Sequence, residues 1–479
     1  MKGLNLIMRK TKIVCTLGPA SESEEMLRKM LEAGMNVARF NFSHGTREEQ
    51  GERLKRLRKV ANELDTTVAA LMDTKGPEIR LKDFENGAVM LEAGKQFILT
   101  TEEVLGTSER ATITYKELKD DIREGMSLLI NDGIIELRVD KIEGNEIICT
   151  VIAGGKVSNH KGINAPGAIL SMPYINSVDE ADIRFAARAG YDFIACSFVR
   201  CAEDILKVRK ILKEENSRMK IISKIENMQG IDNLDEIIEV SDGVMVARGD
   251  MGVEIPMEQV PILQKDMIKK TVAQGKHVIT ATQMLESMIV NPRPTRAEVT
   301  DIANAIYDGT TAIMLSGETA AGKYPVEAIQ AMDRIAVATE KTINYGGRMR
   351  SISEEGTLDI TSAISHATCQ TAFDIDATAI ITVTMSGFTA ERISRYKPSS
   401  PIIACSTTIE VCRQMNMLYG VKPILIKKDD TSTEHLFQMA IAAAKRNGYV
   451  KAGDKVVLTA GVPLGVSGNT NMIEVSVID

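Results

Sequence analysis

The sequence predicts an α/β protein in which a (β/α)8 barrel carries an inserted β-barrel lid and is followed by an open-sheet α/β domain. Short apolar runs alternate with amphipathic segments in residues 1–76 and again in residues 175–345, which is the rhythm of repeated βα units. Residues 77–174 instead show short alternating runs punctuated by Gly and Asp, without a helical period. Residues 346–479 resume the βα rhythm after eight barrel units are complete. We therefore expect three domains with these boundaries.

The first three barrel strands precede the lid. They are expected at Thr11–Thr16, Asn36–Asn41 and Val68–Met72. Ser21 with Glu24 three residues later predicts an N-cap for a helix that runs to about Glu32. A second helix is expected at Glu48–Leu64, and the third strand ends at the Asp-Thr-Lys-Gly-Pro run of residues 73–77.

The remaining barrel units follow the lid. Their five strands are expected at Asp192–Ser197, Lys220–Ser223, Gly243–Ala247, His277–Ala281 and Ala312–Leu315. Helices between them are expected at Val178–Ala189, Ile231–Glu239, Ile262–Ala273 and Arg296–Ala305. In the C-terminal domain, strands are expected at Ala379–Val383, Pro401–Ala404, Pro423–Ile426, Lys455–Leu458 and Ile473–Val477.

Composition narrows the class of protein. The net charge is −7 with both signs mixed, and Trp is absent, so neither a polyanion binder nor a stacking platform for nucleic acid is expected. No apolar run approaches the roughly 18 residues of a membrane span, and the start has no signal-peptide core. The seven cysteines form no C-x-x-C pair, which favours free thiols in a reducing compartment. We expect a cytoplasmic protein that binds neither nucleic acid nor membranes.

Polar residues follow seven of the eight predicted barrel strands at their carboxyl ends, where such barrels build active sites. These residues are Arg39, Asn41, Ser43, Asp73, Thr74, Ser197, Lys224, Glu226, Arg248, Asp250, Thr282, Ser316 and Glu318. A polar residue at the end of one strand is explained by a solvent-exposed loop. Polar and charged residues at the ends of seven strands indicate a functional site.

The charges in this set point to phosphoryl transfer. The carboxylates of Asp73, Glu226, Asp250 and Glu318 would repel one another in one cleft unless cations neutralised them. Two or three carboxylates with open water positions suit Mg²⁺ or Mn²⁺. Arg39, Lys224 and Arg248 in the same place suit a phosphate. A structural ion pair between Lys224 and a neighbouring carboxylate is an alternative interpretation, and both roles are compatible.

Other chemical motifs are incomplete. Residues 317–324 imitate a phosphate-binding loop, but Tyr324 stands where the metal-binding hydroxyl belongs, so a strand-to-helix turn is expected. Ser43 and His44 with Asp73 suggest a hydrolytic triad, but no G-x-S-x-G elbow surrounds the serine. The five histidines are scattered, which argues against a zinc site.

Eight segments together resemble the pyruvate kinase family, in the family's order. They are KIVCTLGP at residues 12–19, NVARFNFSHG at 36–45, DTKGPEIR at 73–80, ISKIEN at 222–227, MVARGD at 245–250, TATQMLESM at 280–288, NPRPTRAE at 291–298 and MLSGET at 314–319. The resemblance covers residue 9 to the end and is closest to bacterial members without an extra C-terminal domain. It implies a glycolytic enzyme, a homotetramer, that converts phosphoenolpyruvate and ADP to pyruvate and ATP.

The resemblance also implies roles for matching residues. Lys224, Thr282 and Arg39 would be catalytic. Substrate would contact Arg39, Lys224, Gly249, Asp250 and Thr282, and Mg²⁺ or Mn²⁺ would bind Glu226 and Asp250. A K⁺ ion would bind Asn41, Ser43, Asp73 and Thr74, while the nucleotide would contact Asn41, His44, Arg80 and Lys161. Ser316 and Glu318 would support the site. Family members with Glu at the position of Glu78 generally need K⁺, so we expect K⁺ dependence.

The C-terminal domain resembles the effector-binding domain of the family. Thr384, Ser386, Gly387, Thr389 and Gly468 are the expected contacts for a phosphorylated allosteric effector, since backbone amides before a helix can hold phosphate. Gly461–Asn471 would close over it. Fructose 1,6-bisphosphate, AMP and sugar monophosphates all remain possible, and ordinary glycine-rich turns are the alternative.

Two competing functions remain. Another metal-dependent barrel enzyme acting on phosphoenolpyruvate or pyruvate, an aldolase or lyase, would need neither the lid nor Lys161. An inactive sugar-phosphate sensor predicts loss of Lys224, Glu226, Asp250 or Thr282, and all four are present.

Overall fold

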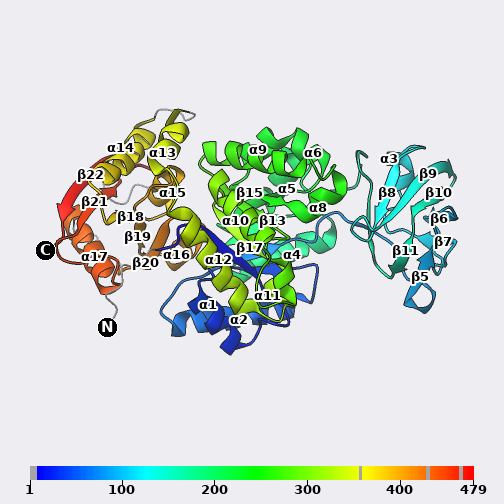
Figure 1. The fold of residues 1–479 in the computed structure, drawn as a ribbon, viewed down its shortest axis with the longest axis horizontal. Coiled ribbons are helices and arrows are strands. Elements are labelled where there is room, and N and C mark those ends of the chain that lie inside the picture. The colour runs from blue at the N-terminus through cyan, green and yellow to red at the C-terminus, as the bar shows by residue number, and fades with distance from the viewer. Residues whose placement is uncertain (1–7, 355–358, 428–431, 463–467) are drawn as a thin grey trace.

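The computed structural model describes residues 8–354, 359–427, 432–462 and 468–479. Its three parts lie in a row, with a central barrel, a lid of strands at one end and the C-terminal domain at the other (Figure 1). Among the described residues, no helix is both long enough and apolar enough to cross a membrane.

The central part is a closed barrel of eight strands in the order β1-β17-β16-β15-β14-β13-β3-β2, all paired in parallel. The barrel closes where Lys12 pairs with Ala312. This confirms the predicted (β/α)8 fold. The strands are β1 Lys12–Thr16, β2 Val37–Asn41, β3 Ala69–Asp73, β13 Phe193–Cys196, β14 Lys220–Ile225, β15 Gly243–Ala247, β16 His277–Ala281 and β17 Ala312–Leu315.

Helices surround the barrel. They are α1 Glu24–Ala33, α2 Arg47–Glu63, α4 Ser177–Ala189, α5 Ala202–Glu214, α6 Met228–Asp232, α7 Leu234–Val240, α8 Arg248–Glu254, α9 Val260–Ala273, α10 Arg296–Asp308, α11 Gly317–Ala320 and α12 Pro325–Glu340, with 3₁₀ turn η2 Glu286–Ile289. The predicted N-cap of α1 was wrong. Ser23 accepts the capping hydrogen bond from the Met26 amide, while the buried Ser21 hydroxyl bonds Gly18 in the preceding turn.

The lid (strands β4 to β12) is a seven-stranded mixed sheet in the order β4-β12-β8-β9-β10-β6-β7, with a two-stranded sheet β11-β5. A bridge between Leu81 and Ile113, next to edge strands β4 and β7, brings the two edges together. This closure agrees with the predicted β-barrel. The strands are β4 Ile79–Arg80, β5 Ala88–Leu91, β6 Gln96–Thr100, β7 Arg110–Thr112, β8 Ser127–Ile130, β9 Ile135–Glu143, β10 Glu146–Ala153, β11 Gly155–Ser158 and β12 Gly162–Asn164; 3₁₀ turn η1 Glu85–Gly87 and helix α3 Leu118–Asp121 interrupt them.

The C-terminal domain has an open five-stranded sheet in the order β20-β19-β18-β21-β22, in which only the β21-β22 pair is antiparallel. This confirms the predicted open α/β sheet. The strands are β18 Ala379–Val383, β19 Ile402–Ser406, β20 Val421–Leu425, β21 Lys455–Ala460 and β22 Met472–Val477; the helices are α13 Tyr345–Glu354, α14 Ile360–Asp374, α15 Phe388–Arg395, α16 Ile409–Met415 and α17 Thr433–Arg446.

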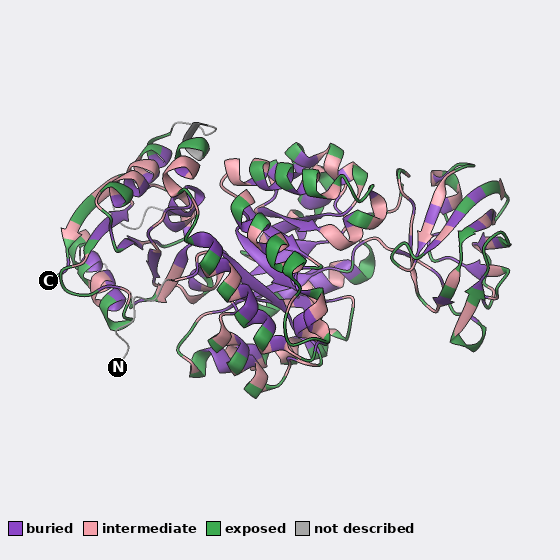
Figure 2. Cartoon of the chain, viewed as in Figure 1, coloured by how far each residue is buried: buried purple, intermediate pink, exposed green. Residues whose placement is uncertain are grey.

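The barrel interior is filled by apolar side chains, and its strands are buried (purple in Figure 2). Val14, Phe193, Met245 and Ile279 pack there, and Met417 of the C-terminal domain joins them. Because Lys12 at the start of β1 also bonds the Val421 carbonyl, the C-terminal domain covers the amino ends of the barrel strands. The carboxyl ends are left to build a site.

Candidate active site

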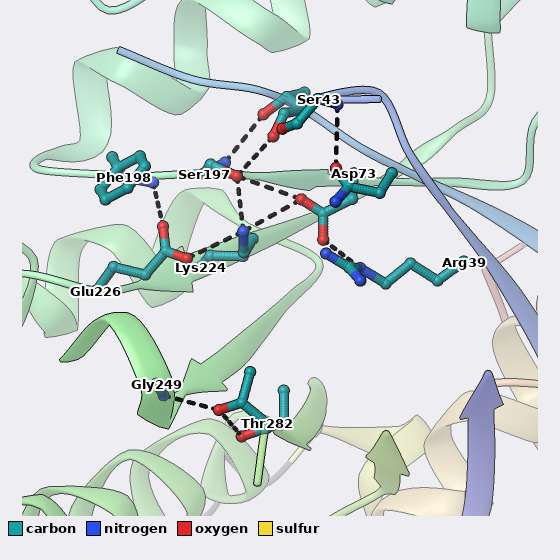
Figure 3. Close-up of polar contacts among 12 residues, drawn as sticks. Arg39, Ser43, Asp73, Ser197, Phe198, Lys224, Glu226, Gly249 and Thr282 are labelled. Atoms are coloured by element: carbon teal, nitrogen blue, oxygen red, sulfur yellow. Dashed lines mark hydrogen bonds and ion pairs between the residues drawn. The ribbon is translucent and has the colours of Figure 1, made fainter. Parts of the chain in front are cut away.

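The ends of β2, β3 and β14 bring oppositely charged side chains together at the carboxyl rim of the barrel. Arg39 comes from β2, Asp73 ends β3 and Lys224 lies on β14, and Figure 3 shows them in one hydrogen-bonded group. In parallel strands the backbone bonds are already satisfied within the sheet, so the side chains at strand ends are free to face a common cleft.

Lys224 is the centre of this group and is only 8 % exposed. Its ammonium donates to Ser197 Oγ at 2.7 Å and to Asp73 Oδ1 at 3.1 Å, and it lies 3.0 Å from Glu226 Oε1. Burial alone would lower the pKa of Lys224, but Asp73, Glu226 and Asp250 outweigh burial and raise it. The lysine is therefore a fixed positive charge, not a base.

Asp73 holds two cations in place. Arg39 Nε donates to its Oδ2 at 2.6 Å, and the Arg39 guanidinium also donates to Thr16 Oγ1 at 2.9 Å. Burial opposes ionisation of Asp73, yet the adjacent Arg39 and Lys224 lower its pKa. The Asp73 carboxylate thus stays ionised and orients both cations.

Glu226 is fully buried, and each of its carboxylate oxygens has a polar neighbour. The Phe198 amide donates to its Oε2 at 2.5 Å, and Oε1 lies 3.0 Å from the Lys224 ammonium in an ion pair without hydrogen-bond geometry. Burial raises the pKa of Glu226, Lys224 opposes that rise and Asp250 adds to it. Phe198 has φ +54°, a strained conformation for a non-glycine residue, and this backbone turn faces its amide toward the carboxylate.

The two neighbouring carboxylates of Glu226 and Asp250 are suited to bind a divalent cation. A cation would relieve the repulsion between them, and carboxylate oxygens are ligands that suit Mg²⁺. The described residues contain no group of three or more His, Cys, Asp or Glu arranged to hold a metal. Mg²⁺ is commonly bound by one or two protein carboxylates, with substrate and water supplying the remaining ligands.

Thr282 follows β16 and contacts the start of α8. Its Oγ1 accepts from the Gly249 amide at 2.7 Å and donates to the Ala281 carbonyl at 2.6 Å (Figure 3). The backbone φ of Thr282 is +67°, which is rare for a β-branched residue. Arg248 donates to the Thr282 carbonyl at 2.7 Å and to Asp301 at 2.7 Å, so its guanidinium supports this turn instead of adding to a phosphate site.

The predicted K⁺ ligands lie at the ends of β2 and β3. Asn41 Oδ1 accepts from the Ser43 amide at 3.0 Å, and Thr74 Oγ1 accepts from the Ser197 amide at 3.0 Å. Ser197 Oγ donates to Asp73 Oδ1 at 3.2 Å and so joins this set to Lys224. Asn41 and Asp73 are paired in register at the ends of these two adjacent strands, so the four residues bring oxygen atoms of the type that K⁺ binds to one part of the rim.

Three predicted nucleotide contacts line one cavity of about 650 Å³ between the lid and the barrel. His44 comes from the barrel, Arg80 and Lys161 come from the lid, and Asp250 of α8 also lines the cavity. Arg80 pairs with Glu78 through two hydrogen bonds of 2.8 and 2.5 Å. Asn41, also predicted to contact nucleotide, is not among the residues that line this cavity.

Glu318 binds backbone amides of the segments that follow β16 and β17. Its two carboxylate oxygens accept from the Leu285 amide at 3.0 Å and the Ser316 amide at 2.7 Å. Burial raises the pKa of Glu318, while these backbone bonds oppose the rise. The pseudo phosphate loop after Ser316 is the short helix α11, as the sequence predicts.

The predicted effector residues gather at the start of α15. The Gly387 amide donates to Thr384 Oγ1 at 3.0 Å, and Gly387 has φ +85° at the N-cap. Thr389 lies 3.0 Å from Thr470, which follows Gly468 in the chain. Ser386 falls in the same turn, between Thr384 and Gly387. Residues 463–467 of the predicted closing loop lie outside the described residues.

Sequence reasoning missed the contributions of Phe198 and Thr16. Phe198 acts through its amide, which carries no side-chain signal, and Thr16 is a buried residue of an otherwise apolar strand. Ser197 was recognised only as a polar strand end, although it bonds Lys224, Asp73 and the Thr74 carbonyl.

Comparisons with known proteins agree across the chain. The family model for "Pyruvate kinase, barrel domain" matches residues 8–329, and that for "Pyruvate kinase, alpha/beta domain" matches residues 362–476. Pyruvate kinase of Geobacillus stearothermophilus is 50 % identical over 473 residues, which is 98 % of this chain and 80 % of the relative.

Two further relatives extend this likeness. Pyruvate kinase of Staphylococcus aureus strain MRSA252 is also 50 % identical, over 98 % of this chain and 81 % of the relative. A crystal structure of a pyruvate kinase from Cryptosporidium parvum superposes with a TM-score of 0.93 at 39 % identity, covering 98 % of this chain and 96 % of that one.

Proposed function

Because this chain belongs to the pyruvate kinase family and transfers the phosphoryl group of phosphoenolpyruvate to ADP, we propose that the group around Lys224 is where the transfer takes place. The observation that supports this most is the buried Lys224 ammonium, held by Asp73, Ser197 and Glu226 at the barrel rim. Lys224 and Arg39 would stabilise the charge on the phosphoryl group in transit, since fixed cations in a dry site do this at no cost of reorganisation.

Glu226 and Asp250 would hold the divalent cation, Mg²⁺ or Mn²⁺. The support is the electrostatic repulsion between the buried Glu226 carboxylate and Asp250, which a cation would relieve. When bound, such a cation neutralises substrate oxygens and draws negative charge from the leaving enolate. Glu226 in turn is kept in orientation by the Phe198 amide.

Gly249, Asp250 and Thr282 would hold the substrate carboxylate. Backbone amides at the start of α8 can donate to an anion, and Thr282 Oγ1 already fixes the Gly249 amide. Thr282 would also lie near the path by which the enolate carbon gains its proton through water. Bound substrate would therefore replace internal hydrogen bonds of this turn.

A K⁺ ion would be held by Asn41, Ser43, Asp73 and Thr74. Support comes from the oxygen atoms gathered at the ends of β2 and β3. Glu78 forms an ion pair with Arg80, and as a carboxylate it cannot supply a positive charge in place of the ion. We therefore propose that activity depends on K⁺.

ADP would occupy the cavity between lid and barrel, in contact with His44, Arg80 and Lys161, with Asn41 nearby. The cavity volume of about 650 Å³ is in the range of small-molecule sites. The lid would exclude water, which otherwise competes with ADP for the phosphoryl group.

Regulation, assembly and location are further parts of the proposal. A phosphorylated effector would bind Thr384, Ser386, Gly387, Thr389 and Gly468 in the C-terminal domain of residues 346–479. The family relation supports a homotetramer. Seven free cysteines, six of them buried, support a reducing compartment, the cytoplasm.

The test is pyruvate formation from phosphoenolpyruvate and ADP with Mg²⁺, read by coupled reduction to lactate, with and without K⁺. Lys224→Met should reduce kcat at least about a thousandfold, because it removes the charge that would stabilise the transferred group. Lys213→Met changes an exposed lysine and should match the wild type.

Full activity without K⁺ would overturn the ion assignment but leave the catalytic lysine intact. An active Lys224→Met enzyme would overturn the assignment of the transfer site itself.

A further inference from the structure

The lid touches α8 at two adjacent residues, beyond the contacts at its hinge. Asn164 on lid strand β12 donates from Nδ2 to Glu254 Oε1 at 2.8 Å. One residue earlier, Val253 lies against the lid turn at Gly133, where an added Cβ would come within 3.6 Å of the valine methyl. The lid therefore docks on the carboxyl end of α8 by shape and by a hydrogen bond.

Glu254 accepts this bond from an electrostatically unfavourable position. It is partly buried at the carboxyl end of α8, where the helix dipole disfavours an anion. Burial raises its pKa, the Asn164 bond opposes the rise, and Asp250 on the same helix adds to it. A carboxylate in this position costs stability unless a donor such as Asn164 compensates.

The hinge is anchored separately. Arg200, after β13, donates to the carbonyls of Leu170 at 3.0 Å and Met172 at 2.9 Å, on the chain that returns from the lid. Asp204 holds the Arg200 guanidinium at 3.1 Å. With the hinge fixed there, a contact away from the hinge is needed to define the angle of the lid.

Asn164 and Glu254 both line the cavity assigned to ADP, together with lid residues Arg80 and Lys161. Helix α8 also carries Gly249 and Asp250 at its other end. We propose that the Asn164–Glu254 hydrogen bond sets the lid at its working distance from α8, which makes these two side chains positioning residues for nucleotide binding. This inference rests on the proposed function.

The test is a double-mutant cycle on steady-state kinetics. Asn164→Ala and Glu254→Ala should each raise the KM for ADP about tenfold, the effect of losing one hydrogen bond to a charged acceptor, with little change in the KM for phosphoenolpyruvate. The double variant should equal either single variant, because both changes remove the same bond.

Two conservative variants separate positioning from general damage. Glu254→Gln keeps an oxygen that accepts from Asn164 and should retain a KM for ADP near that of the wild type. Asn164→Asp opposes two carboxylates and should raise the KM further than alanine does. Glu258→Ala, an exposed carboxylate just beyond α8, is the matched control and should have no effect.

The inference is wrong if the single effects add in the double variant, or if Glu254→Gln behaves like Glu254→Ala. It is also wrong if both substrates lose affinity equally, because that pattern reports a damaged α8. In each of these cases the wild-type enzyme is still active. Failure of the proposed function would instead appear as an inactive wild-type enzyme, and the inference would then fail as well.

Discussion

Asp73 is the residue that links the cations of the site, since it accepts from Arg39, Ser197 and Lys224. Asp73→Asn keeps the shape but removes the charge, so the two buried cations would face each other with less compensation. We expect the variant to lose about 3 kcal/mol of stability, the cost of breaking a buried ion pair, and to need more K⁺ for activity. Urea denaturation and K⁺ titration of kcat measure the two effects.

Glu52→Gln is the control for this loss, because it breaks an exposed ion pair with Lys55 and should leave stability unchanged. Equal stability of the Asp73→Asn and Glu52→Gln variants would show that the Asp73 network does not hold the rim together.

At the scale of single residues, side-chain charge was predictable and hydrogen bonding was not. Lys224, Asp73 and Arg39 were predicted because charged residues directly after apolar strands are conspicuous, and the barrel brings them together. The Phe198 amide was missed because its direction depends on a positive φ. Arg248 was first grouped with the phosphate ligands, although in three dimensions it faces Asp301 and the Thr282 turn.

At the scale of elements, Glu298 fixes the start of α10 to the turn that follows the Thr282 loop. Its carboxylate accepts from the amide and hydroxyl of Thr295 in a capping box, and from the amide and hydroxyl of Ser287 in η2. We expect Glu298→Ala to cost about 2 kcal/mol in urea unfolding at pH 7, since bonds to a charged acceptor are lost.

This loss should depend on pH. Burial would raise the pKa of Glu298, but the Ser287 and Thr295 bonds lower it below its ordinary 4.5. The contribution of Glu298 is therefore fully present above about pH 4.5 and disappears as the pH falls through the lowered value. Glu327→Ala, an exposed acid in the first turn of α12, is the control, and a similar loss there would contradict the prediction.

The hydrophobic periodicity of the sequence predicted the positions of the helices and strands well, but it predicted their ends less well. All eight barrel strands lie where the apolar runs are, because a parallel strand must be buried on both faces. The start of α1 was displaced by two residues because Ser21 and Ser23 are both plausible caps, and packing against Gly18 decides between them. The closure of the lid through Leu81 and Ile113 depends on contacts distant in sequence that no local pattern predicts.

At the scale of the whole molecule, the order of barrel, lid and C-terminal domain was predictable, but their docking was not. Met417 of the C-terminal domain packs against the apolar interior of the barrel, and this contact depends on the tertiary structure. The same is true of β14, which begins with Lys220 beside the C-terminal domain and carries Lys224 at the proposed transfer site. One strand therefore connects the C-terminal domain to that site.

The contact at the start of β14 is an ion pair of 2.7 Å between Lys220 and Glu391 of α15, with 21 % and 28 % of the side chains exposed. Burial would raise the pKa of Glu391, but Lys220 and His277 lower it. The pair should thus stabilise the molecule above about pH 4.5 and weaken as the pH falls below that value.

We expect Glu391→Gln and Lys220→Met each to lose about 2 kcal/mol at pH 7, between the values for exposed and buried pairs. Urea unfolding should show that the double variant loses no more than one single variant, because both break the same pair. Glu410→Gln, which breaks an exposed pair with Arg413 on α16, controls for general effects in the C-terminal domain. A loss from Glu391→Gln that persists undiminished at pH 3.5 would contradict the charge pair, because a protonated Glu391 no longer differs in charge from glutamine.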